Sequence, residues 1–297
     1  RDLVLSLVGS EMCIRDRPGH VPVRKEGGRL HGRGAVDAKG PLAAFVLAAA
    51  RAAGKLNSVR MVVIGAVEEE GDARGARHLA RTKPPPWCAI IGEPSGWEGI
   101  TLGYKGVLSL EYRLAQTTSH SAGQEPTAAE RAVRFWNRLA AYAEAANDGE
   151  SGRFHTVDPA LRTFNTSSDG LSDGVTMQIT TRIPPGVEMA DLRERLDGWR
   201  DGAQLRFGAS DPAVQSEKNT ALVRALLRSI RAGCGKPRFK LKTGTSDMNV
   251  VGPAWGCPIV AYGPGDSSLD HTPREHIEIE EYRRGIEVLV RVLEALG

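Results

Sequence analysis

The 297-residue sequence lacks paired cysteines, a long apolar run and an excess of charge of one sign. Its four cysteines are scattered singly, which argues against a disulfide scaffold or a thiolate zinc site and favours a reducing compartment, the cytoplasm. The longest apolar run, 42–50, spans nine residues, whereas a membrane helix needs about 20. A net charge of +3 gives no reason to expect nucleic acid as a partner.

What is present is the composition of a globular protein, with 41% hydrophobic and 25% charged residues. At about 150 residues per domain, the length predicts two domains. Three nearly continuous apolar runs, at 59–67, 88–91 and 258–262, have the character of strands buried on both faces. Helical patterns begin at Gly40-Pro41 and recur later, so strand and helix alternate as in an α/β domain.

The middle of the chain has a different pattern, because its apolar residues alternate with polar ones as in strands with one wet face. Such strands are predicted at 108–114, 175–183 and 205–207, with a weaker one at 161–166, and helices at 127–147 and 189–199. The resulting order, β-α-β-β-α-β, is typical of ferredoxin-like domains.

The predicted fold is therefore α/β, with a mixed, mainly parallel sheet and an inserted ferredoxin-like α+β domain. Residues 1–105 and 213–297 are expected to form the larger domain, and residues 106–212 the inserted one.

Acidic residues follow each of the three apolar strands. Glu68–Glu70 follow the first strand, Glu93 the second and Asp270-His271 the third, while Asp37 precedes a helix start. In open α/β sheets, ligands bind outside the carboxyl ends of the strands. Carboxylates gathered there with an imidazole repel one another and suit Zn²⁺ or a similar divalent ion.

Taken singly, each of these residues has an ordinary structural explanation. The triplet suits a solvated helix start, Glu93 a turn before proline, His271 an exposed loop and Asp37 a helix cap. Their joint placement after three strand ends favours the metal interpretation.

Six motifs in order carry a family resemblance: GRGAVDAKG (32–40), EEEG (68–71), GEPS (92–95), HSAG (120–123), GTSD (244–247) and DHTPRE (270–275). The sequence resembles the two-metal amidohydrolases and exopeptidases that include succinyl-diaminopimelate desuccinylase, acetylornithine deacetylase and carboxypeptidase G. Within the family, it most resembles the branch that hydrolyses lysine or ornithine from the C-terminal glutamate of an acidic amino-group carrier protein.

The resemblance implies a role for individual residues. Asp37 would bridge two divalent ions, Zn or Co, with Glu70, Glu93 and His271 as further ligands and Glu69 as the general base. Substrate-binding roles fall to residues of the inserted domain and the later chain, namely His120, Asn165, Arg182, Gly244 and Thr245. The inserted domain would act as a lid and as the contact of a homodimer, with His120 reaching over the substrate carbonyl. The basic residues Lys236, Arg238, Lys240 and Lys242 are compatible with docking the carrier, although a solvated strand face is the preferred explanation for them.

The sequence departs from the family at its beginning. The family carries an H-x-D motif whose histidine binds the first ion, and here Cys13 falls near that place. The segment SEMCIRDR resembles translated sequencing adapter, so residues 1–17 are expected not to be native family sequence. This leaves open a non-catalytic scaffold beside the hydrolase, and within the hydrolases an acetylornithine deacetylase, a desuccinylase or a dipeptidase.

Overall fold

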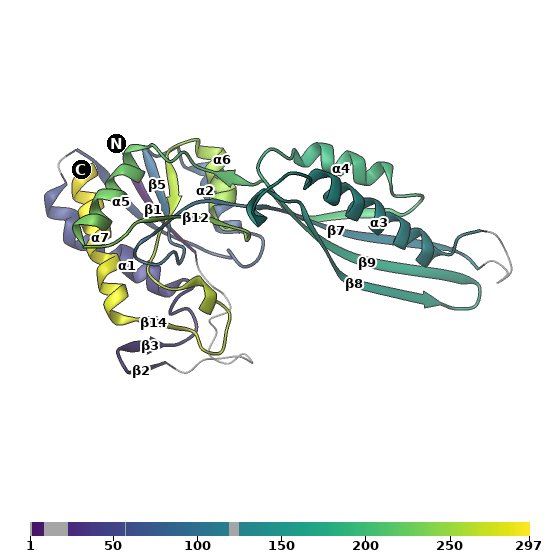
Figure 1. The fold of residues 1–297 in the computed structure, drawn as a ribbon, viewed down its shortest axis with the longest axis horizontal. Helices are drawn as coiled ribbons and strands as arrows, with labels where there is room; N and C mark the ends of the chain where they lie inside the picture. The colour runs from purple at the N-terminus through teal and green to yellow at the C-terminus, as the bar shows by residue number, and fades with distance from the viewer. Residues whose placement is uncertain (1, 9–22, 57, 119–124) are drawn as a thin grey trace. The chain divides into compact units, whose positions relative to one another are not determined.

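The computed structural model describes residues 2–8, 23–56, 58–118 and 125–297. The chain divides into two units. The first contains residues 1–104, 214–242 and 246–297, and the second contains residues 105–213 and 243–245. The first unit is thus built from both ends of the chain (Figure 1).

A seven-stranded sheet forms the centre of the first unit. Its order is β11-β6-β13-β5-β1-β4, and β12 pairs with β6. The strands are β1 (Asp2–Val8), β4 (Arg60–Ala66), β5 (Cys88–Ile91), β6 (Gly99–Tyr104), β11 (Val214–Gln215), β12 (Arg238–Lys242) and β13 (Ile259–Ala261). The four strands β13, β5, β1 and β4 run parallel, whereas β6 is antiparallel to β13. The predicted mixed, mainly parallel sheet is confirmed.

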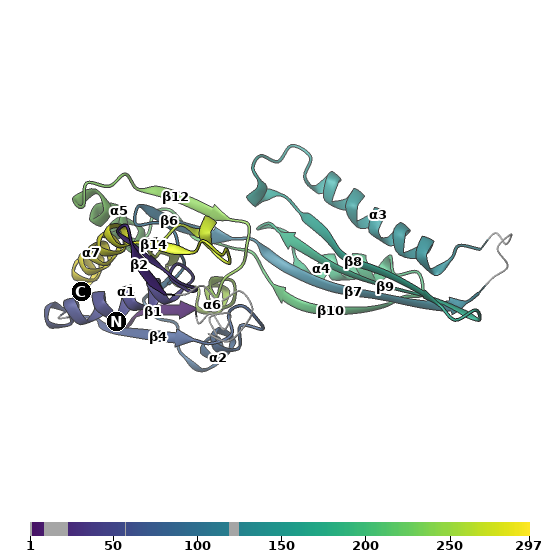
Figure 2. The same cartoon turned by 90° about the horizontal axis from the view of Figure 1, so that it is seen from below.

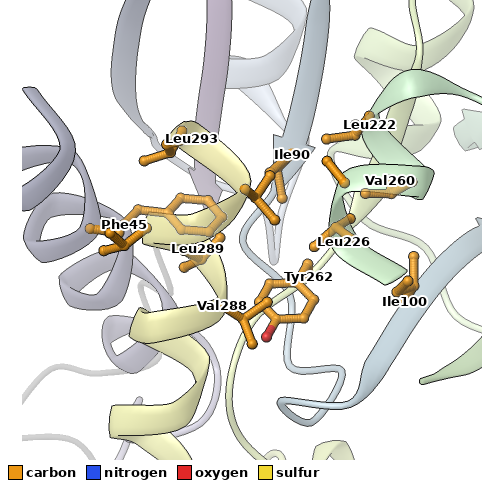
Figure 3. Packing of buried hydrophobic residues seen from close by; sticks show 14 of the residues in the cluster. Phe45, Ile90, Ile100, Leu222, Leu226, Val260, Tyr262, Val288, Leu289 and Leu293 are labelled. Atoms are coloured by element: carbon orange, nitrogen blue, oxygen red, sulfur yellow. The ribbon is translucent and has the colours of Figure 1, made fainter. Parts of the chain in front are cut away.

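Helices cover both faces of this sheet (Figure 2). One layer contains α1 (Lys39–Ala52), α5 (Ala221–Ala232) and α7 (Ile279–Leu296), and the other α2 (Arg74–Thr82) and α6 (Met248–Trp255). Within β5, Ile90 packs into the first layer, as Figure 3 shows, and its neighbours Ala89 and Ile91 pack into the second. This alternation explains why the strand reads as an unbroken apolar run.

Asp2–Val8, inside the segment expected to be foreign, forms strand β1 between β4 and β5. Residues 9–17, including Cys13, lie outside the described residues. The cysteines that the structure describes, Cys88, Cys234 and Cys257, are free thiols.

The sequence patterns did not predict a separate three-stranded sheet, because its strands are only three residues long. Its order is β14-β3-β2, formed by β2 (Arg24–Glu26), β3 (Arg29–His31) and β14 (His276–Glu278). The antiparallel pairing of β3 with β14 brings His31 opposite His276. Strand β3 leads into the segment with Asp37, and β14 follows the segment with His271.

The second unit has the predicted ferredoxin-like arrangement. Its elements are β7 (Gly106–Thr117), α3 (Ala128–Ala146), β8 (Asp158–Ser168), β9 (Ser172–Ile183), α4 (Met189–Gly198) and β10 (Gln204–Asp211). The sheet order is β10-β7-β9-β8, and all neighbouring strands are antiparallel. Alternate residues of β9 are buried against the two helices, which produces the period-two pattern of the sequence.

Three short 3-10 helices, Ala53–Lys55, Arg153–His155 and Ser267–Leu269, complete the described elements.

One fully buried charge anchors the beginning of the second unit. The Lys105 ammonium donates to Asp158 Oδ2 at 2.7 Å and to the carbonyl oxygen of Arg153 at 2.9 Å. It also donates to the carbonyl oxygen of Thr156. Burial lowers the pKa of Lys105, and Asp158 opposes that shift. The lysine is therefore held by groups that favour its charged form.

Candidate metal centre

Three predicted ligands come together at the carboxyl edge of the first unit's sheet. The Nε2 atom of His271 lies 3.3 Å from Asp37 Oδ2 and 3.3 Å from Glu70 Oε1. One ligand atom of each residue lies within 4.8 Å of those of the other two. The three residues follow different elements of the unit, so the fold rather than the local sequence creates this cluster.

The spacing and chemistry of the three atoms fit a divalent ion. Zinc–oxygen and zinc–nitrogen bonds of about 2.0–2.2 Å at tetrahedral angles place ligand atoms roughly 3.3–3.6 Å apart. The two distances of 3.3 Å agree with that value. Two carboxylates and one imidazole are also a donor set that suits Zn²⁺ and similar ions.

The loop that carries Asp37 depends on glycine. Gly34 has φ +81°, a conformation that residues with a Cβ rarely adopt. Its carbonyl accepts from the N–H of Lys39 at 2.8 Å and of Gly40 at 3.2 Å. A Cβ on Gly40 would lie 2.2 Å from the carbonyl oxygen of Ala35, so only glycine fits. The peptide bond from Asp37 to Ala38 is cis.

The three glutamates after β4 have three different environments. Glu68 has φ +62° and forms an ion pair with Arg74 at the start of α2. Glu69 is largely buried, and its burial, with the charges of Glu70 and Asp247, raises its pKa to about 9. Burial and the carboxylate of Asp37 raise the pKa of Glu70. The apparently uniform triplet thus separates into a structural residue, a buried acid and a candidate ligand.

Glu93 follows β5 and is 8% exposed. Burial raises its pKa well above the ordinary value, and the carboxylates of Glu69 and Asp37 raise it further. It therefore belongs to the same acidic edge, but it is not among the three residues whose ligand atoms lie within 4.8 Å. Burial likewise raises the pKa of Asp37, against the opposing charges of His271 and Lys242.

The structure gives three further residues a place at this edge: Asp247, Asp270, which the sequence placed only after the third strand, and Lys242, which the sequence offered only as a residue for docking the carrier. Asp247 is fully buried and raises the pKa of Glu69 and Glu93. Burial, with Asp37 as the main charge, raises the pKa of Asp270 to about 8. Lys242 donates to the carbonyl oxygen of Pro94 at 2.7 Å, and its charge opposes the pKa shifts of Asp37, Glu69, Glu93 and Asp270. The GTSD and DHTPRE motifs contained the signal for the two aspartates.

Four of the candidate substrate-binding residues are described, and they lie in the second unit. Arg182 Nη1 donates to Thr245 Oγ1 at 3.4 Å, a long hydrogen bond, and Gly244 adjoins Thr245 in the same unit. Asn165 is exposed on β8. His120 lies outside the described residues, so its prediction stays untested.

Comparison with known proteins identifies the family. The model of peptidase family M20/M25/M40 matches residues 16–295. The chain belongs to this family.

The named relatives agree with the motifs. The chain is 43% identical to a [LysW]-lysine hydrolase of Deinococcus radiodurans, over 99% of this chain and 82% of that protein. It is 41% identical to a putative [LysW]-lysine/[LysW]-ornithine hydrolase of Thermococcus kodakarensis, over 94% of this chain and 73% of that protein. The resemblance to the carrier-protein branch is confirmed by these matches.

Solved structures show the same fold. The aminopeptidase PepT of Bacillus cereus has a TM-score of 0.79 at 17% identity, covering 99% of this chain and 80% of that one. An M20 family metallo-carboxypeptidase of Sulfolobus solfataricus has a TM-score of 0.73 at 16% identity, covering 98% and 84%. This M20 chain is accordingly a metallohydrolase of amide bonds, and divalent ions are its implied cofactors. Within the part of the chain that the structure describes, no helix is long and apolar enough to cross a bilayer.

Proposed function

We propose that this M20 chain hydrolyses the amide that joins lysine or ornithine to the C-terminal glutamate of an amino-group carrier protein. The observation that carries the chemistry is the cluster of Asp37, Glu70 and His271 at ligand spacing. The observation that carries the substrate is the similarity to relatives named for LysW-linked lysine and ornithine. The pathway is amino-acid biosynthesis, and the scattered thiols favour the cytoplasm as its compartment.

Asp37, Glu70, Glu93 and His271 are the residues that would hold two divalent ions, Zn or Co. When bound, such ions polarise the amide carbonyl and lower the pKa of a bound water toward about 7. The buried acids fit that purpose, because cations would offset the burial that raises the pKa of Asp37, Glu70 and Glu93 and the repulsion that raises the pKa of Glu70 and Glu93 further.

Glu69 is the proposed general base. It lies next to a ligand in sequence, it is largely buried, and its pKa responds to the charges of Glu70 and Asp37. Its carboxylate takes a proton from the attacking water and then transfers one to the leaving α-amine. The products are free lysine or ornithine and the carrier's glutamate γ-carboxylate.

The second unit is the proposed substrate-binding and dimerisation domain. His120, Asn165, Arg182, Gly244 and Thr245 are its candidate contacts, with His120 at the substrate carbonyl. An acidic carrier would complement the basic strand β12, which carries Arg238, Lys240 and Lys242.

A substrate panel tests this function. The chain loaded with Zn²⁺ or Co²⁺ is incubated with lysyl-loaded carrier, N-acetylornithine, succinyl-diaminopimelate and a dipeptide. We expect fastest release from the carrier. Preference for one of the small substrates would instead assign the chain to the deacetylases, desuccinylases or dipeptidases.

A second candidate is a non-catalytic protein that binds carrier-linked amino acids. The observation that favours it is the sequence itself, which contains no His-x-Asp to supply the first ion's histidine. Fewer than one tightly bound ion per chain, together with no cleavage of any substrate, would support this alternative.

A further inference from the structure

A buried carboxylate outside the ligand set contacts the loop that carries Asp37. Glu275 is 1% exposed. Its Oε1 atom accepts from the backbone N–H of Val36 at 3.1 Å and of Asp37 at 3.3 Å. Its Oε2 atom accepts from Arg33 Nη1 at 3.0 Å. One side chain therefore binds three points of the loop that carries Asp37.

The backbone of Glu275 holds the same loop. The N–H of Gly32 donates to the Glu275 carbonyl at 3.2 Å, which extends the antiparallel pairing of β3 with β14. Glu275 lies four residues after His271 and directly before β14. It thus stands where the loop of Asp37 and the loop of His271 both leave the three-stranded sheet.

Stability alone does not explain why a buried ion pair of Glu275 and Arg33 stands at this place. A buried ion pair is costly to desolvate, and apolar side chains of similar volume often stabilise a fold as well or better. The Arg33 side chain is also mostly buried, with 12% of its surface exposed. Apolar side chains cannot, however, bind two consecutive N–H groups, so the carboxylate serves to fix the direction of the Val36–Asp37 backbone.

We propose that Glu275, held by Arg33, is a positioning residue for the metal centre. It fixes the peptide of Asp37 against the segment of His271, so that the two ligands keep their 3.3 Å spacing before an ion arrives. This inference rests on the proposed function, because it assumes that Asp37 and His271 bind a metal. Partners that orient ligands in this way typically contribute 10–100-fold to metal affinity.

The test compares three variants of the whole chain. Glu275→Ala removes every side-chain contact, whereas Glu275→Gln keeps an oxygen that accepts from the two N–H groups and loses the charge opposite Arg33. Glu278→Gln is the matched control. Glu278 lies three residues after Glu275 and forms an exposed ion pair with Arg29. Affinity for Zn²⁺ is measured by competition with a chromophoric chelator, and ligand geometry by the visible spectrum of the Co²⁺ form.

We expect Glu275→Ala to bind Zn²⁺ about 10–100-fold more weakly and to shift the Co²⁺ spectrum. Glu275→Gln should fall between Glu275→Ala and the unchanged chain, and Glu278→Gln should match the unchanged chain. Thermal unfolding without metal separates this role from a purely structural one. A structural role alone would lower the melting temperature and leave affinity and spectrum unaltered, which overturns the proposal.

Two outcomes keep this inference distinct from the proposed function. An unchanged chain that binds no ion contradicts the proposed function itself. If Glu275→Gln and Glu275→Ala bind ions as tightly as the chain without substitutions, only the role of Glu275 is overturned. If Glu275→Ala does not fold, the isosteric Glu275→Gln decides the question by the same two measurements.

Discussion

The two units bury charge in opposite ways. In the second unit, Lys105 is surrounded by Asp158 and by carbonyl oxygens, so its charge is compensated where it lies. At the sheet edge of the first unit, Asp37 raises the pKa of Glu69 and of Glu93, and Glu69 raises that of Glu93 further. A compensated buried charge holds a fold together, whereas a cluster of like charges destabilises it unless a cation binds. The difference distinguishes a structural site from a functional one.

The sharpest test of the acidic edge is Glu69→Gln. It should lower kcat by about 10²–10⁴-fold, the usual contribution of a general base, and leave metal content unchanged. Initial rates and metal analysis of the purified protein measure both. Glu68→Gln is the matched control, because Glu68 pairs with Arg74 and should be dispensable for turnover. Equal activity of both variants would remove Glu69 from the base role.

The counterpart in the second unit is Lys105→Met. Loss of the ammonium leaves Asp158 opposite an apolar group, so the free energy of unfolding should fall by about 3 kcal/mol. Urea unfolding measures the change, and Zn²⁺ affinity should stay constant because the metal ligands lie in the other unit. Adding Asp158→Asn should restore part of the stability. A Lys105 variant with normal stability but altered metal binding would reverse the contrast between the units.

Removal of the metal should lower the stability of the folded protein, because the ions bind the folded first unit. Ions present at 100 times their Kd stabilise the folded state by about 2.7 kcal/mol, so a chelator should lower the Tm of the unchanged chain. His271→Ala should show a smaller difference between the metal-bound and metal-free forms. Identical differences in the two proteins would show that His271 is not a ligand.

The smallest expected effect is at the start of α3. Thr127 and Glu130 form a reciprocal capping box, in which each side chain accepts from the other's backbone N–H. Thr127→Ala should therefore cost about 1 kcal/mol of stability and leave metal affinity unchanged. Urea unfolding and chelator competition measure the two quantities.

Burial patterns made much of the fold predictable. The apolar run at 88–91 became a strand buried on both faces, and the alternation at 175–183 became part of β9. The basic run that forms β12 suggested a strand face in contact with water, which gave no sign of a role at the acidic edge. Only the structure shows that Lys242, at its end, donates to Pro94 beside the acidic edge.

The candidate ligands were found by motif and by position after strands, and the structure brings Asp37, Glu70 and His271 together. The role inferred for Glu275 could not be read from the sequence. Its contacts join residues about 240 positions apart, and although Glu275 ends the DHTPRE motif, no local pattern indicates these contacts. Likewise, the sequence could not separate the three neighbouring glutamates, because their difference arises from tertiary burial and from Arg74.

The discontinuous first unit sets an order of events during synthesis. Strand β13 lies between β5 and β6, so the sheet cannot close until residues 259–261 have left the ribosome. The second unit is nearly continuous in sequence and is complete, apart from residues 243–245, long before that point. Domains generally fold as units while the chain emerges. A nascent chain would thus carry a finished ferredoxin-like module beside an open sheet, and metal capture would wait for the last loop, the one bearing His271.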